Sequence, residues 1–409
     1  MDKQIIHLCE LIKNALHQDN EFFINDEIDW SQMIRMSKKQ NLLAVFLEEA
    51  VKYPAYTSRP EYIKEVQEAM TIVDLQAKRT SAFLGLYKCF VNANVYPLVM
   101  KGIICRELYG KLCDHRPSGD EDILIRICDY EIVKSVLIAN GYMPQMEVES
   151  QEQLKKLQEV SFVHPIEKLH IEVHLNVMGR ENDAHSKMSD CFKDVFEDYR
   201  ELDAGGVRIR TLSHQNHLLF LILHAFKHFI HGGFGIRQML DILMYQEKFG
   251  QEVDYEQLKS VLGYFKADKF WSDLICIGNS YFGFCLSVQQ EANCPERLLE
   301  DMMFCGTFGN GTQALRTATR AITFATGDYL QKKHTNQFLM FWRIIFPNKV
   351  YLLHHAPQLE KRPWLLPVEW VKRWGRFIKW SFLYKGSLAN ESIAISKKRK
   401  DLLKKYNLL

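Results

Sequence analysis

The change of hydrophobic pattern near residue 95 is the feature that most constrains the fold of this chain. Before it, apolar residues recur at helix spacing, as Leu8, Leu11 and Ile12 do, and a long helix is predicted at residues 62–90. After it come short runs of branched apolar residues bounded by polar turns, which indicate strands. Helical spacing returns after Ser213, a typical N-cap residue. A strand-containing unit between helical regions predicts the α+β class.

The strand-containing unit has a definite order of elements. Strands are predicted at residues 96–100, 120–127, 160–164, 168–174 and 207–210. Helices are predicted after the first of these strands, to about residue 112, and after the second, at residues 130–140. The polar turn between the third and fourth strands suits a hairpin. The pattern therefore predicts a small mixed β-sheet with helical regions before and after it in the sequence.

A length of 409 residues suits two or three structural units. We divide the chain into an N-terminal helical region at 1–94, an α/β core at 95–212, a C-terminal helical domain at 213–335, and an irregular wrap with a basic amphipathic tail at 336–409. Helical patterns in the third unit continue to about residue 324. Prolines at 347, 357 and 363 are the reason for expecting an irregular wrap in the fourth.

The tail at residues 371–409 is strongly basic. It holds 11 lysines and arginines against two acids, with its densest run at residues 397–400, whereas the net charge of the whole chain is only +2. A basic terminus on an acidic body suits an anionic partner such as nucleic acid or a membrane surface, and a solvated tail is the simpler explanation. Trp370 and Trp374 could stack on bases, but an amphipathic helix packed on the body is favoured.

Membrane-spanning and disulfide-stabilised classes are not indicated. No apolar run approaches the roughly 18 residues that cross a bilayer, so no stable membrane insertion is expected. The ten cysteines include no CxxC pair, and the first residues form an amphipathic helix containing acids, unlike a signal peptide. Reduced thiols and a cytoplasmic location are therefore expected.

Three carboxylates on two predicted strands form the candidate catalytic and metal-binding group. Because strand side chains alternate, Asp120 and Asp122 point to one face, about 6.5–7 Å apart along the strand. Glu172 lies mid-strand between two apolar residues. Mg²⁺, or Mn²⁺ in its place, suits such oxygen ligands, and two ions can hold both the attacking and the leaving oxygen of a phosphoryl transfer. His174 shares the face of Glu172 and is a possible substrate contact.

Residues around these strands suit phosphate binding. Lys101 and Gly102 close the first strand and open a helix, where a glycine lets a phosphate approach the backbone and helix N–H groups favour anions. In the turn before the second strand, Arg116, Ser118 and Gly119 could hold nucleotide oxygens. We treat all five as candidate nucleotide-binding residues.

Two patterns in the later helices allow more than one interpretation. His224, His228 and His231 recur at helix spacing, but packing or a substrate contact is favoured over zinc because no HExxH motif or cysteine pair accompanies them. Arg237 and Asp241 are four residues apart, which suits an intrahelical ion pair. The alternative is that this second pair faces the site as substrate contacts.

The order of these motifs resembles the uncharacterised nucleotidyltransferase family, which has a polymerase-β-like fold. That family shows Leu-Lys-Gly after a strand, then a tyrosine and an arginine before an aspartate pair. A helix ending on Gly-Tyr follows, and a later strand has an acid two residues before a histidine. The matching residues here are Met100-Lys101-Gly102, Tyr109, Arg116, Asp120-Glu121-Asp122, Gly141-Tyr142 and Glu172-Val173-His174. The stretch from His224 to Asp241 is also similar, so the resemblance spans about residues 25–245.

Four residues depart from the family pattern. Ile103 stands where the broader superfamily has a small residue, although the Lys-Gly form is usual for this family; Leu175 replaces a tryptophan, and Glu172 stands where aspartate is more common. Glu121 replaces the apolar residue between the two aspartates, which places an additional charge beside the site or on its back face. No required carboxylate is missing, so an active site is expected.

The resemblance implies an Mg²⁺-dependent enzyme that transfers a nucleoside monophosphate from an NTP such as ATP to an acceptor hydroxyl and releases pyrophosphate. Asp120 and Asp122 would hold the metal with the triphosphate, and Glu172 would be a third ligand or the base. A small-molecule or protein acceptor is slightly favoured over an RNA end. The alternatives are a non-catalytic nucleotide- or nucleic-acid-binding module of the same fold and, less favoured, a glycosyltransferase with a DxD motif.

Overall fold

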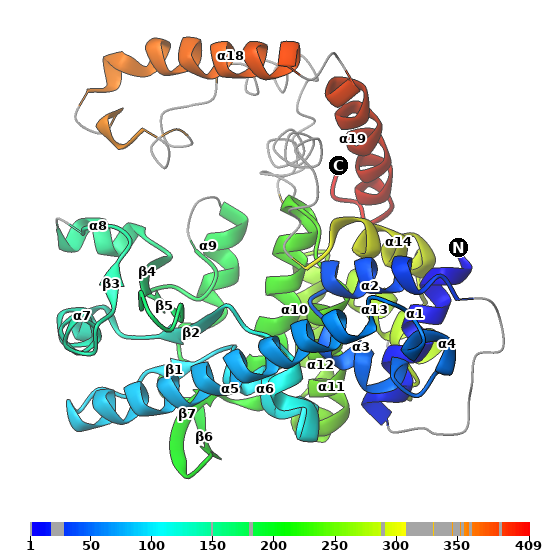
Figure 1. Cartoon of the computed structure of the whole chain (residues 1–409). Helices are drawn as coiled ribbons and strands as arrows, with labels where there is room; N and C mark the ends of the chain where they lie inside the picture. Colours follow the sequence, from blue (N-terminus) through cyan, green and yellow to red (C-terminus); the bar gives the residue numbers. More distant parts are fainter. Residues whose placement is uncertain are drawn as a thin grey trace.

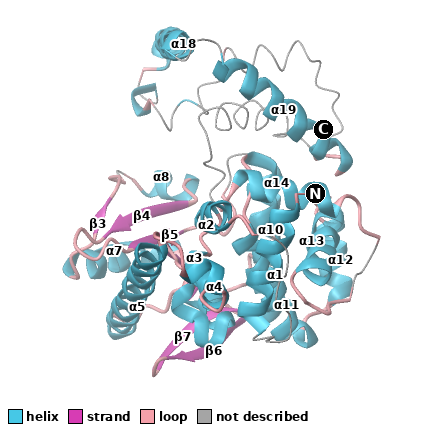
Figure 2. Cartoon of the chain, turned by 45° about the vertical axis from the view of Figure 1, so that its right-hand side comes forward, coloured by secondary structure: helices cyan, strands magenta, loops and turns pink. Residues whose placement is uncertain are grey.

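The computed structural model describes residues 2–17, 28–148, 150–179, 183–287, 291–307, 330, 346, 352, 356–359, 362–383 and 387–409. A mixed sheet lies beside a large helical body, and the long helix α5 (Tyr62–Asn92) runs along the sheet (Figure 1). Figure 2 shows the strands gathered on one side of the molecule and most helices on the other. The predicted α+β class is therefore confirmed.

Within the described residues, helices alone precede the first strand, as predicted. They are α1 (Lys3–His17), α2 (Trp30–Lys39), α3 (Leu43–Ala50), α4 (Pro54–Thr57) and α5. α2 begins where the Asp29 side chain accepts a hydrogen bond from the Gln32 amide, a favourable N-cap. α5 places Phe83, Tyr87 and Phe90 in the apolar core of the sheet, so packing of one face fixes this long helix.

The sheet contains seven strands in the order β3-β4-β5-β2-β1-β7-β6. Their bounds are β1 (Leu98–Val99), β2 (Asp120–Leu124), β3 (Met143–Pro144), β4 (Glu159–Val163), β5 (His170–His174), β6 (Tyr199–Ala204) and β7 (Val207–Leu212). β1 pairs with β7 and β2 with β5 in parallel, and the other neighbours are antiparallel. The predicted hairpin between residues 160–164 and 168–174 is confirmed as β4 and β5.

The connections and edges of the sheet differ from the prediction in three ways. The strand expected at residues 120–127 ends at Leu124, and edge strands β3 and β6 were not predicted. β3 has only two residues, and most positions of β6 are solvent-accessible, so neither carries an apolar pattern. The connecting helices are α6 (Ile103–Arg106), a 3-10 helix (Glu107–His115), α7 (Tyr130–Ala139), α8 (Gln151–Lys156) and α9 (Asp183–Asp190).

The helices after the sheet form the body of the molecule. They are α10 (His214–His231), α11 (Ile236–Phe249), α12 (Tyr255–Tyr264), α13 (Asp268–Tyr281) and α14 (Pro295–Cys305), and they are followed along the chain by α18 (Leu366–Leu383) and α19 (Ser387–Lys405). Ser213 caps α10 as predicted, because its side chain accepts from the Asn216 amide. The helical pattern expected at residues 308–324 lies outside the described residues.

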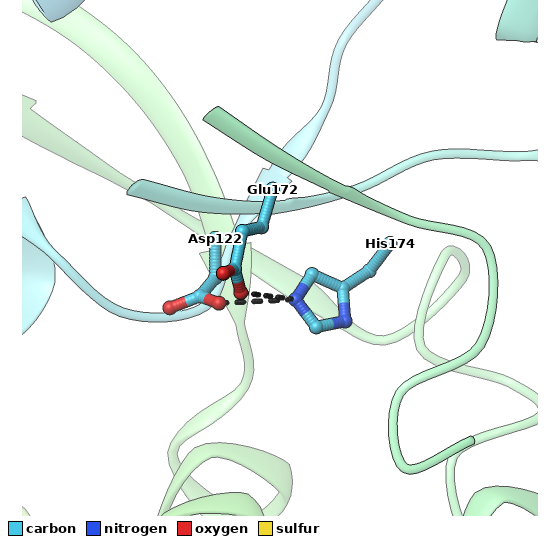
Figure 3. Close-up of side chains that lie close together, drawn as sticks. All are labelled: Asp122, Glu172 and His174. Atoms are coloured by element: carbon cyan, nitrogen blue, oxygen red, sulfur yellow. Dashed lines mark hydrogen bonds and ion pairs between the residues drawn. The ribbon is translucent and has the colours of Figure 1, made fainter. Parts of the chain in front are cut away.

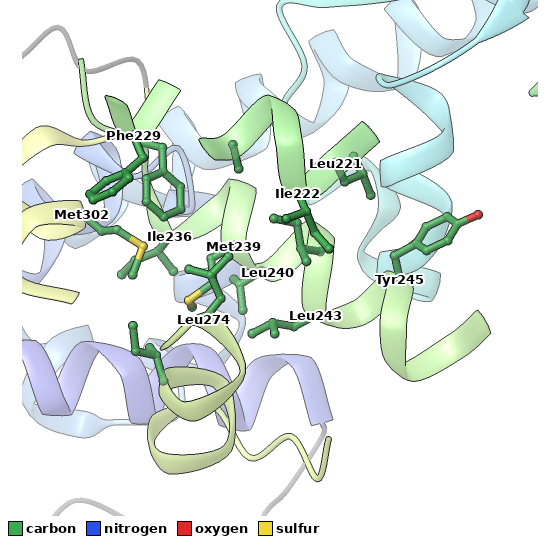
Figure 4. Close-up of a cluster of buried hydrophobic side chains, with 14 of the residues drawn as sticks. Leu221, Ile222, Phe229, Ile236, Met239, Leu240, Leu243, Tyr245, Leu274 and Met302 are labelled. Carbon is green, nitrogen blue, oxygen red and sulfur yellow. The ribbon is translucent and has the colours of Figure 1, made fainter. Parts of the chain in front are cut away.

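Most buried apolar residues of the sheet and the body belong to two cores. One core, formed by residues between Phe83 and Ile209, lies within the sheet unit. The other combines α1, α2 and α3 with α10, α11, α13 and α14, and it includes Leu402, Leu403 and Tyr406 from the end of the chain. Figure 4 shows part of this second core, where Phe229 of α10 and Ile236 of α11 face Met302 of α14. Residues from both ends of the chain therefore share one core.

The basic tail contributes to the body as well as to the surface. α18 packs Trp370 against a small apolar cluster containing Leu352 and Leu359, and the rings of Trp370 and Trp374 both contact Phe346. In the densest basic run, Arg399 is only 2% exposed; it pairs with Asp301 and donates to the Phe229 carbonyl. The solvated tail that the sequence suggests as the simpler explanation is therefore wrong at Arg399.

Hydropathy along the described helices gives no candidate for a bilayer-crossing segment, since none of them combines sufficient length with sufficient apolar character.

Candidate active site

Strands β2 and β5 bring two of the predicted carboxylates together. The strands pair in parallel with Asp120 opposite His170 and Asp122 opposite Glu172. Because paired residues on neighbouring strands point to the same face, Asp122 and Glu172 lie side by side. The donor atoms of Asp122, Glu172 and His174 all lie within 4.8 Å of one another (Figure 3).

His174 lies at the centre of this group. Its Nε2 is 3.0 Å from Asp122 Oδ1, 3.4 Å from Glu159 Oε2 and 3.7 Å from Glu172 Oε2. His174 and Asp122 are buried, whereas Glu172 and Glu159 are partly open to solvent. One imidazole therefore faces three carboxylates, and the group has an accessible side.

Glu159 is a further neighbour of the site, and the sequence motifs do not indicate it. It begins β4, where it pairs with His174 across the antiparallel β4–β5 register. The predicted hairpin held the signal, because extending its register by one residue beyond residue 160 would have placed Glu159 beside His174.

Burial and neighbouring charges shift the pKa values of His174, Asp122 and Glu172 in different directions. Burial lowers the pKa of His174, but hydrogen bonds to Asp122 and Glu172 outweigh it and raise this pKa to about 10. Burial raises the pKa of Asp122, but its hydrogen bond with His174 and the nearby Lys101 charge hold it well below its ordinary value. The pKa of Glu172 is raised to about 7, chiefly by burial and by the neighbouring carboxylates. The site therefore strongly favours a positive charge near Asp122.

This donor set fits a divalent cation. Carboxylate oxygens are the usual ligands of Mg²⁺ and Mn²⁺, and an imidazole nitrogen is a common ligand of transition metals. Among the described residues, Asp122, Glu172 and His174 are close enough to hold one ion together, and Asp120 does not belong to that group. Asp120 lies two residues earlier on β2, and burial and the charge of Asp122 raise its pKa. It is therefore placed beside the ion position, at one strand repeat from Asp122.

Lys101 supplies a cation from the end of β1. Its Nζ lies 2.8 Å from Nδ1 of His224 on α10, and its charge lowers the pKa values of both Asp120 and Asp122. Burial and the Lys101 charge hold the pKa of His224 well below its ordinary value, so this imidazole is neutral and accepts from the ammonium group. Lys101 is thus held between the carboxylates of β2 and the helical body.

Gly102 follows Lys101 with φ +63°, a conformation that glycine adopts without strain. A Cβ atom at this position would collide with the carboxylate of Glu121. The next amide, that of Ile103, donates to Glu121 Oε2 at 2.8 Å. The first amide of the four-residue helix α6 is thus occupied by a carboxylate of the chain itself.

Arg116 and Asp241 form a buried ion pair between the turn before β2 and helix α11. Arg116 Nε donates to Asp241 Oδ1 at 2.7 Å, and Nη2 donates to Oδ2 at 2.6 Å. The Tyr109 hydroxyl also donates to Asp241 Oδ1. Arg237 of α11 donates to the Pro117 carbonyl, so both members of the Arg237 and Asp241 pattern hold the turn before β2.

Helix α5 holds the same turn from another side. Gln76 Oε1 accepts from the Ser118 amide at 2.7 Å, and Arg79 donates to the Ser118 carbonyl at 3.1 Å. The Ser118 side chain is buried and accepts from Arg116. Gly119 has open space where a side chain would project. The turn that precedes Asp120 is therefore fixed by α5 and α11 together. Gly119 is the position in this turn that has free space beside it.

The three histidines of α10 have separate surroundings. His224 contacts Lys101, the His228 ring lies 4.5 Å from the His224 ring, and His231 lies 3.1 Å from His185. No described cluster suited to one metal ion contains these histidines. Of the interpretations left open by their spacing, the contacts favour packing and a role beside the site over zinc binding.

Comparison with known proteins identifies the family of the chain. The sequence profile described as an uncharacterised nucleotidyltransferase matches residues 26–283, well over half of the chain. The chain belongs to the uncharacterised nucleotidyltransferase family. Neither the curated proteins nor the solved structures include a significant match.

Proposed function

We propose that this chain is a metal-dependent nucleotidyltransferase that moves a nucleoside monophosphate from an NTP to an acceptor hydroxyl. The observation that supports it most is the convergence of Asp122, Glu172 and His174 from two parallel-paired strands, in a chain of this family. Lys101, held by His224, adds a cation near the carboxylates, where a triphosphate would require one.

Asp122 and Glu172 would hold the ion through oxygen, with Asp120 beside them. His174 would act as a nitrogen donor on losing the proton that its raised pKa retains in the metal-free site. When bound, a divalent cation supplies Lewis acidity at the phosphate and neutralises the charge of the triphosphate. The oxygen donors suit Mg²⁺, and the added imidazole makes Mn²⁺ a plausible second choice.

The reaction forms one bond and breaks one bond at the α-phosphorus. The acceptor oxygen bonds to this phosphorus while the bond to the bridging oxygen breaks, and pyrophosphate leaves with the electron pair. Lys101 would stabilise the charge that accumulates on the leaving oxygens. Glu172, with a pKa of about 7, could take the acceptor proton when it is not a metal ligand.

The remaining candidate residues would shape the nucleotide site. Arg116 and Asp241 are engaged with each other, which favours a positioning role for them over direct phosphate contact. Gly119 and the backbone of Gly102 would allow the triphosphate to approach the strand ends. Ser118 and Arg237 would fix the turn before Asp120.

A small-molecule or protein acceptor remains favoured over an RNA end. Arg399, in the densest basic run of the tail, is buried against Asp301 and cannot contribute to an RNA surface. We retain a cytoplasmic location as part of this proposal, since NTPs and reduced thiols both suit it.

The direct test is calorimetry of the full chain with each of the four NTPs in the presence of Mg²⁺ or Mn²⁺, followed by transfer of labelled NMP in a lysate. We expect one NTP to bind only with metal and to label an acceptor. The Asp122→Asn variant should lose both signals. Metal-dependent binding without transfer would indicate the non-catalytic module, and selective binding of a nucleotide-sugar would indicate the glycosyltransferase.

A further inference from the structure

The middle residue of the Asp-Glu-Asp run lies on the opposite face of β2 from the site. Glu121 follows Asp120 and precedes Asp122, so the strand pleat turns its side chain to the other side of the sheet. There it is 0% exposed, and Arg106 of α6, 1% exposed, lies against it with Nη1 2.6 Å from Oε1. A fully buried ion pair therefore stands behind the carboxylates of the site.

This pair contacts the segment that carries Lys101. The second oxygen of Glu121 accepts from the Ile103 amide at 2.8 Å, and the carboxylate fills the space where a side chain at Gly102 would project. On the other side of Lys101, the Met100 amide donates to the Asp122 carbonyl at 2.8 Å. β2 thus holds the backbone on both sides of Lys101, once by its main chain and once by Glu121.

We propose that Glu121 and Arg106 are positioning residues that fix the Lys101–Gly102 turn and so direct the Lys101 ammonium group into the site. Lys101 is then held at its backbone by Glu121 and at its Nζ by His224. The proposal deepens the proposed function, on which its kinetic consequence rests, but its structural consequence can be measured without any activity.

Stability alone is a weak explanation for this pair. Buried ion pairs replaced by apolar residues of similar size often leave a protein equally stable or more stable, because burial removes both charges from water. The family pattern also has an apolar residue between the aspartates, so a charge is not required there to build the strand. What the charge adds is a fixed acceptor for the Ile103 amide and a defined position for Arg106.

The structural test uses the full chain and the reactivity of lysines toward an amine-acylating reagent, followed peptide by peptide by mass spectrometry. Lys101, held by His224, should react slowly compared with exposed lysines. In the double variant Glu121→Leu/Arg106→Leu its rate should rise at least fivefold, and in Glu121→Gln at least twofold. The matched control is Asp301→Leu/Arg399→Leu, which removes another buried ion pair and should leave the Lys101 rate unchanged.

Kinetics provide the second measurement. We expect kcat for nucleotidyl transfer to fall about tenfold to a hundredfold in the Glu121→Leu/Arg106→Leu variant, since a small misplacement of a positioned group has effects of this size. KM for the NTP should change less than threefold, and the control variant should keep kcat within twofold.

The outcomes distinguish the positioning role of Glu121 and Arg106 from the proposed nucleotidyltransferase function. Lys101 reactivity that changes less than twofold in both Glu121 variants would overturn the positioning role, as would an equal rise in the control. If the double variant fails to fold, Glu121→Gln decides, because it preserves the side-chain volume while it removes the charge that pairs with Arg106 and weakens the acceptor of the Ile103 amide. Absence of transfer in the unmodified chain would refute the proposed function, and lysine reactivity would still decide the role of Glu121 and Arg106.

Discussion

Buried charge is arranged differently on the site face of strands β2 and β5 and in the helical body. In the body, buried charges have individual partners: Arg399 pairs with Asp301, and Asp273 accepts from Tyr406 and from two backbone amides. At the site, one imidazole faces three carboxylates, and Asp120 lies nearby. The body is therefore arranged for stability without any ligand, whereas the site retains unbalanced negative charge that a cation would relieve.

The largest effect expected from this difference between site and body is the loss of activity in Asp122→Asn. If Asp122 holds the ion, transfer should fall at least about a thousandfold, which corresponds to roughly 4 kcal/mol of transition-state stabilisation. Glu159→Gln, which changes a more exposed carboxylate beside the same histidine, should lose less than tenfold. Steady-state transfer assays check both, and more than a tenth of normal activity in Asp122→Asn would remove this residue from the catalytic group.

In the body, Arg399→Leu should have the largest effect on stability. It leaves Asp301 buried without its partner, which costs about 3–5 kcal/mol in comparable cases. The double variant Asp301→Leu/Arg399→Leu should recover most of that loss. Urea unfolding measures both, and a single-variant cost below about 1 kcal/mol would show that Arg399 is not an anchor of α19.

The pH dependence of stability is a third test, through His217 at the start of α10. Burial, with the charge of Arg200, lowers the pKa of His217 to about 3, so the folded state holds this imidazole neutral. An unfolded histidine takes up a proton near pH 6.5. Stability should therefore be fully present above pH 6.5 and fall as the pH drops toward 3, by up to about 1.4 kcal/mol per pH unit.

Chemical denaturation between pH 7.5 and 5.5 tests this dependence. His217→Phe keeps a ring of similar shape in the core and should make the profile flatter by about 1 kcal/mol over that range. His214, which is partly exposed, provides a control in His214→Phe, where the change should be smaller. Equal profiles in the unmodified chain and His217→Phe would show that His217 is not a neutral core residue.

The smallest effect concerns the metal-free site. Burial and neighbouring carboxylates raise the pKa of Glu172, so its charge destabilises the folded state at neutral pH, and Glu172→Gln should raise stability by about 1 kcal/mol. Asp122 has the opposite sign, because His174 and Lys101 stabilise its charge, and Asp122→Asn should melt lower. Thermal unfolding with a chelator present compares the two variants, and a shift of the same sign in both would contradict this division.

The sequence was informative where local pattern determines position. The branched residues of β2 and β5 predicted both strands, and strand alternation placed Asp120 and Asp122 on one face. The β4–β5 hairpin followed from a polar turn between two apolar runs. These features depend on neighbours within a few residues, which a sequence displays directly.

Contacts between segments far apart in the sequence could not be predicted from local pattern. Asp241 binds Arg116 across 125 positions, so its spacing from Arg237 gave no sign of that partner. Arg399 lies in a basic run that is typical of a solvated surface, yet it is buried by a contact with Asp301 on α14. Glu121 was recognised as a departure, but its side of the sheet and its contact with Ile103 required the structure.

The two apolar cores also imply an order of folding during synthesis. All residues of the sheet core lie between positions 83 and 209, so that core can close once this segment has left the ribosome. The body core joins Leu8 to Leu408 and cannot be completed until almost the whole chain is made. At about 5–20 residues per second, the roughly 200 residues between these events take on the order of 10–40 s. For that interval, the apolar faces of α1, α2 and α3 lack their final partners and are exposed to non-native contacts.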